Sequence, residues 1–257
     1  MAEKPLLQLK GVSKHFGAVQ ALTQVDFEVR AGEAMALVGD NGAGKSTLIK
    51  SLVGIYTFDE GEIFFDGQPV KIRGPRDAAA LGIEVVYQDL ALADNLDVVA
   101  NMFLGREYIQ PPFFLNETRM EKAARETLDS LSVTTLRSVR QTVAGLSGGQ
   151  RQAVAVAKSV MWNSKVVILD EPTAALGVAQ TRQVLDLVKR LAAKGLAVVL
   201  ISHNLHDVFE ASDRITVLRL GRRVAECVTR ETTQQQVVHA ITAGTLDAVP
   251  GMQEKAA

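Results

Sequence analysis

Apolar positions along the chain follow two spacings, one typical of strands and one typical of helices. Short apolar runs, such as 34–38, 166–169 and 196–201, predict strands that are buried on both faces. Longer stretches with an apolar residue every three or four positions, such as 178–193, predict amphipathic helices. Because the two kinds of segment alternate, we predict an α/β fold in which helices cover a mostly parallel sheet.

The strand signals disappear between about residues 89 and 163. A helix is expected over 98–104, and the Pro111-Pro112 pair breaks the chain before the next helical segment. Thr118-Arg119-Met120-Glu121 has the capping-box spacing for the start of that segment. This region therefore predicts a helical insertion within the sheet-forming core.

Strand signals flank the insertion on both sides and assign the rest of the chain to one domain. Residues 6–10 and 25–29 alternate like half-buried strands, and 215–228 predicts a hairpin around Gly221. Thr233-Gln234-Gln235-Gln236 matches a capping box for a last helix. The predicted organisation is a single domain over 5–245, with a core of 5–88 and 164–245, a helical insertion at about 89–163, and a tail over 246–257.

A glycine-rich turn lies between the predicted strand at 34–38 and a helix that begins near Lys45. Such a turn aims backbone N–H groups at phosphates, and the helix adds the positive end of its dipole. Lys45 can reach the terminal phosphates, and the Ser46 hydroxyl can ligate Mg²⁺. A chance match to the pattern is expected in roughly one in a hundred chains of this length. The predicted nucleotide-binding residues of this loop are Gly39, Asp40, Asn41, Gly42, Ala43, Gly44, Lys45, Ser46 and Thr47.

The composition of the chain limits which partners and which cellular compartment this nucleotide site can have. The net charge of −1 and the pI near 6.4 provide no basic field for nucleic acid. Cys227 is the single cysteine, which excludes an internal disulfide and fits a reducing compartment. Residues 1–5 open no signal peptide, and every apolar run is shorter than the ~20 residues of a membrane helix. We expect a cytosolic chain whose membrane spans, if it works at a membrane, come from another subunit.

Phe16 is a candidate for contact with the nucleotide base. It precedes Gly17 and is expected at a turn between two strands. An aromatic ring there either packs into the core or forms a platform on which the base stacks. Both interpretations stay open on the sequence alone, and stacking is worth roughly 1–3 kcal/mol in nucleobase systems.

Four polar residues stand at the ends of predicted strands, where ligands bind in α/β sheets. Asp170 ends a buried run, and a buried carboxylate needs a partner, for which phosphate-bound Mg²⁺ is the natural choice. Glu171 either orients or deprotonates the water that attacks the γ-phosphate, or only caps the next helix. Gln88 can touch Mg²⁺ or that water, and His203 can donate to the γ-phosphate. Alone, Gln88 and His203 are ordinary polar residues; beside a phosphate loop they become candidate ligands.

Residues 146–150 read Leu-Ser-Gly-Gly-Gln and precede an alanine-rich helix. Together with 39–47, Gln88, 166–171 and His203, they resemble in order and spacing the motifs of ATP-binding cassette ATPases. The resemblance extends from about residue 6 to 243, and the combination of motifs is highly specific for that family. It implies an ABC-type P-loop ATPase with an antiparallel N-terminal β region, a mostly parallel core and a helical subdomain.

The resemblance also implies a mechanism. In that family two cassettes pair head to tail, and each ATP lies between one phosphate loop and the signature motif of the other cassette. Ser147, Gly148, Gly149 and Gln150 would then contact ATP held by a second copy, so the chain is expected to work as a homodimer when ATP is bound. Ser147 to Gly149 also open a helix, whose N-terminus attracts anions.

One position departs from the family pattern. Where cassette ATPases usually carry Ser-Ala-Leu-Asp after the carboxylates, this chain has Ala174-Ala175-Leu176-Gly177. Gly177 cannot make the contact that the aspartate makes across the dimer. We therefore expect the coupling between the two ATP sites to differ or to be weaker, whereas Glu171 argues that hydrolysis is retained.

Residues 89–107, 173–178 and 201–204 resemble importer ATPases for monosaccharides such as ribose, xylose and fructose. The partners implied are two integral-membrane permease subunits and an external substrate-binding protein, with the chain peripheral on the cytoplasmic face of the inner membrane. The region 88–107 would form a groove for a permease helix. The sequence names neither the sugar nor, beyond the resemblance, the direction of transport.

Three other functions compete with sugar import. An importer ATPase for another small solute would share every motif above. A cassette ATPase of DNA repair or of the ribosome usually shows coiled-coil insertions, tandem cassettes or a basic surface, and none is visible in the sequence. A small-molecule kinase with the same phosphate loop would not need residues 146–150.

Overall fold

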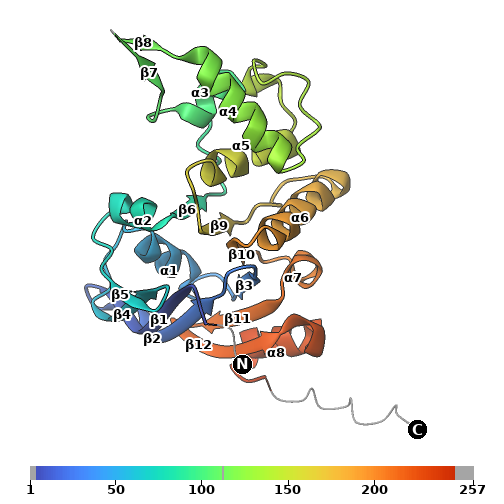
Figure 1. Cartoon of the computed structure of the whole chain (residues 1–257). Helices are drawn as coiled ribbons and strands as arrows, with labels where there is room; N and C mark the ends of the chain where they lie inside the picture. Colours follow the sequence, from blue (N-terminus) through green and yellow to red (C-terminus); the bar gives the residue numbers. More distant parts are fainter. Residues whose placement is uncertain (1–3, 112, 247–257) are drawn as a thin grey trace.

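A six-stranded sheet forms the centre of the computed structural model, which describes residues 4–111 and 113–246 (Figure 1). Neighbouring strands are parallel except for β11 and β12, which form the predicted hairpin around Gly221. The fold class predicted from the alternation of strands and helices is therefore confirmed. In spatial order the strands are β12 (Arg222–Val228), β11 (Arg214–Arg219), β3 (Ala34–Val38), β10 (Ala197–Ile201), β9 (Val166–Asp170) and β6 (Ile83–Val86).

The central strands are buried on both faces because each face carries its own apolar layer. Along β9, Val167 and Leu169 belong to one core cluster, and Val166 and Ile168 belong to the other. The first cluster packs against α6 (Val178–Ala193) and the helical region; the second packs against α1 (Lys45–Leu52) and the N-terminal sheet. This two-sided burial explains why the strands read as continuous apolar runs.

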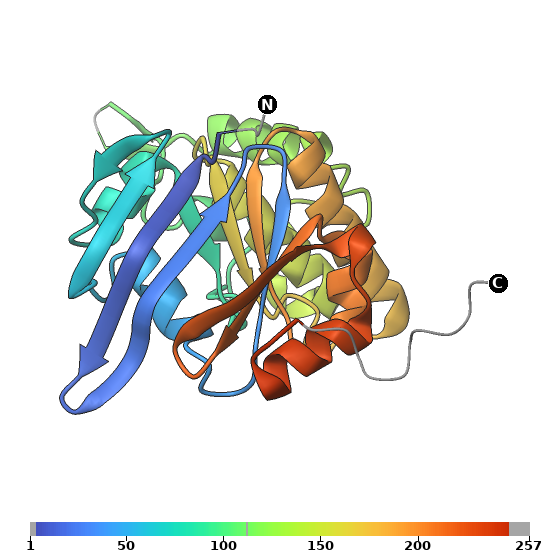
Figure 2. The same cartoon turned by 90° about the horizontal axis from the view of Figure 1, so that it is seen from below.

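The N-terminal sheet is antiparallel and lies beside the central one (Figure 2). Its strands are, in spatial order, β2 (Val19–Val29), β1 (Leu7–Phe16), β4 (Glu60–Phe65) and β5 (Gln68–Val70). β1 and β2 continue well beyond the predicted segments 6–10 and 25–29, because register shifts absorb their irregular middle parts. Gly17, with φ of 58°, makes the turn that leaves Phe16 at the end of β1. Helix α2 (Pro75–Leu81) connects this sheet to β6.

The region between β6 and β9 is mainly helical and lies at one end of the molecule (Figure 1). It holds α3 (Val98–Phe103), α4 (Glu117–Ser130), a short 3-10 helix (Val143–Gly145) and α5 (Gly148–Val160). Two features differ from the prediction. A small hairpin, β7 (Ile109–Gln110) and β8 (Phe114–Leu115), precedes α4. The predicted capping box at Thr118 is wrong: Asn116 caps α4 by accepting a hydrogen bond from the Arg119 N–H.

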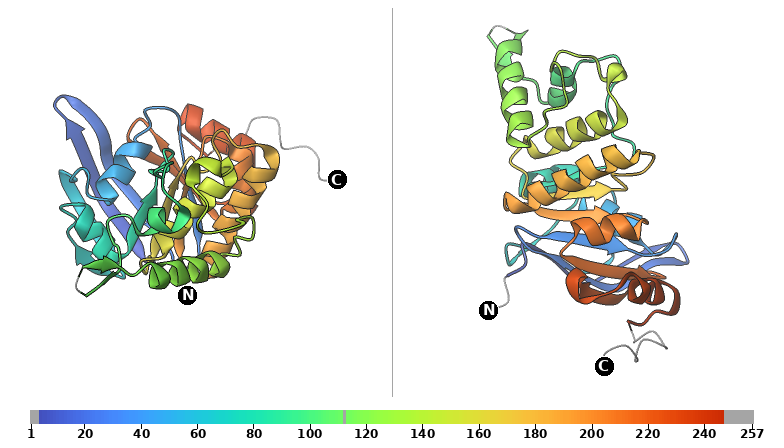
Figure 3. Two further views of the ribbon diagram at one scale, coloured as in Figure 1. Left: turned by 90° about the horizontal axis from the view of Figure 1, so that it is seen from above. Right: turned by 90° about the vertical axis from the view of Figure 1, so that its right-hand side faces the viewer.

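The last helices cover the far edge of the molecule (Figure 3). They are α7 (Leu205–Ala211), a short 3-10 helix (Thr229–Glu231) and α8 (Gln234–Ala243). The predicted capping box of α8 is confirmed, since Thr233 and Gln236 bond reciprocally. The predicted tail, 246–257, lies outside the described residues from position 247 onward. Within the described part of the chain, no helix is both long and apolar enough to cross a membrane.

Candidate nucleotide site

The glycine-rich loop follows β3 and ends at α1, in the predicted strand–turn–helix order. Gly39 has a φ of 153°, and a Cβ there would lie 2.3 Å from the carbonyl oxygen of Leu218. Gly44 is the N-cap of α1 with a φ of 104°, and a Cβ there would lie 2.8 Å from Leu22 Cδ2. A larger residue at either position would strain or displace the loop. The loop is therefore shaped by packing against β11 and β2.

Lys45 stands at the first turn of α1 with its ammonium held by the loop itself. Its Nζ donates to the carbonyl oxygens of Gly39 at 2.6 Å and Asp40 at 3.1 Å. Burial lowers the pKa of Lys45, while the charges of Glu171, Asp40 and Asp170 oppose that shift. These carbonyls hold the ammonium in the concave part of the loop. A phosphate oxygen placed there would complete its coordination.

Asp170 ends β9, beside Ile201 at the end of β10. Burial and the charge of Glu171 raise the pKa of Asp170, opposed by Lys45 and Lys50. This carboxylate therefore lies close to the lysine of the phosphate loop. The sequence predicts that Asp170 and the phosphate loop, which are far apart along the chain, contribute to one site at this edge of the sheet. The structure brings them together.

The side chains of Glu171 and His203 are in contact across the ends of β9 and β10. Glu171 Oε2 lies 2.8 Å from His203 Nδ1, and the backbone N–H of His203 points at the same oxygen at 3.4 Å. Glu171 has a φ of 50°, and its own N–H donates to Ile201 O at 2.9 Å. Its carboxylate is only 16% exposed, whereas the histidine ring is 75% exposed. The interpretation of Glu171 as a simple helix cap is wrong, because Gly177 occupies the N-cap of α6.

Gln88 lies two residues beyond the end of β6, which is the strand next to β9. Its side chain is exposed at the same edge of the sheet as Asp170. The preceding residue, Tyr87, is close enough to Asp170 for that carboxylate, together with burial, to raise the pKa of the phenol. The strand order thus places Gln88 next to the carboxylates.

A partly buried hydrogen bond that the sequence gave no reason to expect supports these side chains. Thr173 Oγ1 donates to Asp207 Oδ2 at 2.6 Å, and the Asp207 side chain is 4% exposed. Thr173 belongs to the turn after Glu171, and Asp207 lies in the first turn of α7, just after His203. The hydrogen bond between Thr173 and Asp207 therefore connects the segment that carries Glu171 with the segment that carries His203.

Phe16 is not a core residue, since it is 42% exposed. Its ring meets Tyr56 edge to face, with centroids 5.0 Å apart and planes at 74°. Lys14 Nζ lies 5.4 Å from the Phe16 centroid. The core interpretation is thus excluded, and stacking on a base stays a prediction. Tyr56, which the sequence did not single out, places a second aromatic ring beside that of Phe16.

The signature residues form the N-terminus of α5. The Ser147 side chain accepts from the Gln150 N–H, and the Gln150 side chain accepts from the Ser147 N–H at 2.9 Å. Gln150 Nε2 also donates to Thr135 O at 2.6 Å. Ser147 and Gly148 are exposed, whereas Gly149 is buried. Among the described residues, no hydrogen bond of 147–150 reaches the chain's own phosphate loop.

The signature glycines pack on the turn that follows Glu171. A Cβ on Gly148 would lie 2.8 Å from Leu176 Cδ2, and one on Gly149 would lie 3.2 Å from Gln180 Cβ. Gly177, the residue after Leu176, is the N-cap of α6 and provides no side-chain hydrogen bond there. Val178 beside it is 79% exposed.

Comparison with known proteins decides the family. The family described as ABC transporter matches residues 22–174, more than half of the chain. The chain belongs to the ABC transporter family. As a member, it is an ATP-binding cassette that hydrolyses ATP.

Its relatives within the ABC transporter family carry the names of sugar import proteins. The fructose import ATP-binding protein FrcA of Rhizobium meliloti is 47% identical over 248 residues, which is 94% of this chain and 95% of the relative. The xylose/arabinose import ATP-binding protein XylG of Sulfolobus acidocaldarius is 44% identical over 95% of this chain and 96% of its own length. The ribose import ATP-binding protein RbsA of Clostridium tetani is 39% identical over 93% of this chain, but only 47% of RbsA is covered.

Solved structures of ABC transporter cassettes share the fold. One cassette, described as an ATP-binding cassette of an ABC transporter, aligns with a TM-score of 0.80 and 26% identity, covering 92% of this chain and 98% of the other. Another is described as the dimeric structure of a bacterial ABC transporter cassette; it aligns with a TM-score of 0.70 and 26% identity over 87% of this chain and 99% of that one.

Proposed function

We propose that this cassette is the ATP-hydrolysing subunit of a membrane importer for a monosaccharide. The observation that carries the proposal is the 47% identity to the fructose import protein FrcA over nearly the whole length of both chains. The xylose/arabinose import protein XylG supports it at similar coverage. The names of these relatives all refer to monosaccharides but differ in the sugar. The proposal therefore names monosaccharides as the substrate class and does not name one sugar.

In the proposed mechanism, the loop at 39–47 holds the phosphates of ATP. Its N–H groups and Lys45 neutralise the terminal phosphates, and Phe16 with Tyr56 supports the base. Ser46, Gln88 and Asp170 provide the oxygen donors that suit Mg²⁺ in phosphate sites. Mg²⁺ held by these residues would offset the negative charge of the phosphates.

Glu171 is proposed to orient and deprotonate the attacking water. Its side chain is mostly shielded from solvent, and its carboxylate accepts a hydrogen bond from the backbone N–H of His203, so it stays fixed as the phosphate reacts. His203 is proposed to contact the γ-phosphate. With Nδ1 engaged by Glu171, the remaining ring nitrogen donates a hydrogen bond only when the ring carries both protons. The contact between Glu171 and His203 would then position both side chains.

The complete site is proposed to need a second copy of the chain. Ser147, Gly148 and Gly149 would contact the γ-phosphate of ATP bound to the partner, with Gln150 fixing the turn. The exposed position of Ser147 and Gly148 at the N-terminus of α5 supports this role, and Gly149 is buried beside them. The likeness to a dimeric cassette structure supports the pairing.

The remaining partners are proposed from the family. Two permease subunits would span the membrane, and an external binding protein would deliver the sugar, with the cassette on the cytoplasmic face. We also propose that the single domain over 5–245 divides into the core, 5–88 and 164–245, and the helical subdomain, about 89–163. The permease would dock on the helical side.

Reconstitution tests the function directly. Vesicles would carry the cassette with a permease and binding protein for fructose, xylose, arabinose or ribose in turn, and ATP hydrolysis would be measured with each sugar. We expect one sugar to stimulate hydrolysis, with loss of activity on chelating Mg²⁺. If hydrolysis in every combination equals that of the isolated cassette, the importer role is refuted.

A further inference from the structure

The end of β1, which carries Phe16, is paired with a strand on one side only. β1 pairs with β4 from Leu7 to Ser13, and Ser13 lies opposite Glu60. Within the part of the chain that the structure describes, residues 14–16 have strand partners in β2 alone. Backbone groups on the open side need water or a side chain as a partner. Strand pairing alone therefore fixes the segment before Phe16 only from the β2 side.

The side chain of Asp59, the residue before β4, takes the place of a strand on the open side. The N–H of His15 donates to Asp59 Oδ2 at 2.7 Å, and Lys14 Nζ donates to Oδ1 at 2.9 Å. The imidazole Nδ1 of His15 also lies 2.7 Å from Oδ2. The N–H of Asp59 itself donates to Ser13 O at 2.9 Å. Both the backbone and the side chain of Asp59 therefore hold the end of β1.

The bonds to Asp59 are those of an ionised carboxylate. The hydrogen bond from the His15 N–H, followed by that from Lys14, lowers the pKa of the Asp59 carboxyl. Hydrogen bonds to a charged acceptor are shorter and stronger than neutral ones. The Lys14 side chain is only 12% exposed, and its Nζ lies 5.4 Å from the Phe16 ring centroid. Asp59 therefore fixes the backbone next to Phe16 and a cation over its ring.

The segment that contains Asp59 also carries the ring that contacts Phe16. Tyr56, three residues earlier, meets Phe16 edge to face. The N–H groups of Ile55 and Tyr56 donate to Lys50 O at 2.8 and 3.2 Å, near the end of α1. Since α1 begins at Lys45, residues 55–59 connect the helix of the phosphate loop with the strand end that carries Phe16.

We propose that Asp59 is a positioning residue for the base of ATP: it fixes the end of β1 so that the Phe16 ring stands ready for adenine. This role rests on the proposed stacking of the base on Phe16. Asp59 acts through Phe16 and makes no contact of its own with the nucleotide. A ring that is held in place before binding loses less conformational freedom when the base arrives, which increases affinity.

A purely structural role for Asp59 makes different predictions. An ion pair that only stabilises the fold would change the melting temperature, and any loss of affinity would affect the phosphates and the base alike. A positioning role affects the base alone. Its effect also disappears once the Phe16 ring is absent, because two residues that act through one contact are not additive.

The test compares Asp59→Ala, Phe16→Ala and the double variant in the full chain. Affinities for ATP and for inorganic tripolyphosphate are measured by calorimetry, and kcat and KM for ATP by steady-state hydrolysis. We expect Asp59→Ala to weaken ATP binding by about fivefold or more, up to the loss caused by Phe16→Ala. Tripolyphosphate binding and kcat should stay at the parent level while KM rises. The double variant should bind ATP like Phe16→Ala.

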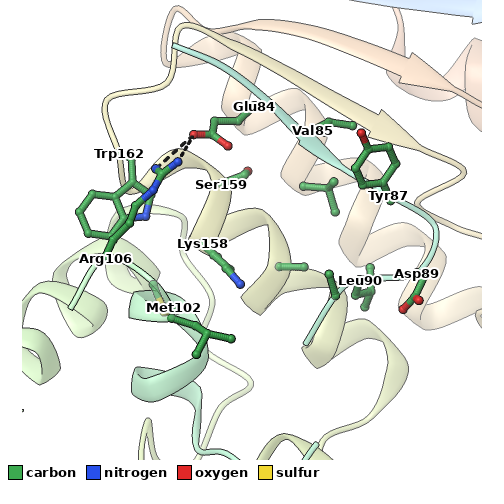
Figure 4. Close-up of a pocket in the computed structure, with 14 residues that line it drawn as sticks. Glu84, Val85, Tyr87, Asp89, Leu90, Met102, Arg106, Lys158, Ser159 and Trp162 are labelled. Atoms are coloured by element: carbon green, nitrogen blue, oxygen red, sulfur yellow. Dashed lines mark hydrogen bonds and ion pairs between the residues drawn. The ribbon is translucent and has the colours of Figure 1, made fainter. Parts of the chain in front are cut away.

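Glu84→Ala is the matched control. Glu84 lies in a groove between β6, α3 and α5, and both terminal nitrogens of Arg106 lie 3.2 Å from its Oε1 atom (Figure 4). Its side chain is 21% exposed, close to the 26% of Asp59. The control therefore removes a carboxylate of similar exposure and pairing, but from β6 of the central sheet. It should bind ATP like the parent.

Two results would overturn the role of Asp59 while leaving base stacking on Phe16 intact. One is parent affinity of Asp59→Ala for ATP beside weakened binding by Phe16→Ala. The other is a loss that extends to tripolyphosphate or that adds to the loss of Phe16→Ala. If Phe16→Ala itself binds ATP like the parent, base stacking on Phe16 is refuted, and the role of Asp59 is refuted with it.

A second variant decides the question if Asp59→Ala does not fold. Asp59→Asn keeps the shape of the side chain and removes its charge. It should weaken ATP binding by about threefold or more, because a neutral acceptor holds the His15 N–H and Lys14 less strongly, and leave tripolyphosphate binding unchanged. Parent affinity for ATP in this variant would then overturn the role of Asp59.

Discussion

The hydrogen bond between Thr173 and Asp207 provides a sharp test of how the hydrolytic groups are held. Thr173→Val keeps the shape of the side chain and deletes the hydroxyl that donates to Asp207 Oδ2 at 2.6 Å. The Asp207 side chain is 4% exposed, and His206 Nδ1 lies 4.0 Å from its Oδ1 atom. Water cannot easily replace the lost donor, so the variant leaves a buried carboxylate oxygen unsatisfied.

The expected cost follows from this geometry. A hydrogen bond to a charged group contributes about 1.5–3 kcal/mol to the free energy of unfolding. For a chain of this size, each kilocalorie lowers the melting temperature by about 2–4 °C. Thr173→Ser should restore the hydroxyl and most of the stability. Thr118→Val, at an exposed position of α4, is the control for exchanging threonine for valine in this protein.

The same variant should affect hydrolysis more than nucleotide binding. Thr173 follows Glu171 in the turn, and Asp207 follows His203 in α7, so the bond fixes the distance between the two reacting groups. We expect kcat to fall by about tenfold or more, since small displacements of reacting groups are costly. KM for ATP should change little, because the phosphate loop is untouched.

A double-mutant cycle measures the pair itself. Thr173→Val, Asp207→Asn and the double variant would be compared by urea unfolding and by ATPase assays. A coupling energy of about 0.5–3 kcal/mol is expected for contacting residues. If the coupling is near zero and Thr173→Val hydrolyses ATP at the parent rate, the bond does not position Glu171 and His203, and the reasoning is refuted.

Three further substitutions test the nucleotide site. Lys45→Ala should weaken ATP binding by about 10- to 100-fold in calorimetry, as the loss of a charge-assisted bond implies; unchanged affinity would contradict the phosphate-loop assignment. Glu171→Gln should still bind ATP and trap a dimer on gel filtration while turnover drops by about 10²- to 10⁴-fold; parent turnover would show that Glu171 is not the base. Phe16→Ala should weaken ATP binding by roughly 1–3 kcal/mol but leave tripolyphosphate binding unchanged; equal ATP affinity would make Phe16 a packing residue only.

Local patterns were sufficient for much of this fold. The phosphate loop was predictable because its glycines, flanking strand and helix lie in one continuous stretch, 34–52. Glu171 and His203 could be placed together because each follows a buried strand, and parallel strands end at the same edge of a sheet. Their adjacency required β9 and β10 to be neighbours, which the sequence alone did not state.

Other features depend on contacts that no local pattern contains. Asn116 and Thr118 are both good cap residues, and only the β7–β8 hairpin before α4 decides that the chain enters the helix at Asn116. Thr173 and Asp207 are separated in the sequence by all of α6 and all of β10, so their bond is purely tertiary.

The contact between Gly148 and Leu176 limits how the helical region can rotate. A Cβ on Gly148 would lie 2.8 Å from Leu176 Cδ2, so the start of α5 packs closely on a side chain of the turn 171–177. A rotation of the helical region must slide across this turn or drag it along. Glu171 lies at the other end of the same turn. In a pair of cassettes, each chain would sense ATP in its partner's site as a displacement of its own hydrolytic carboxylate.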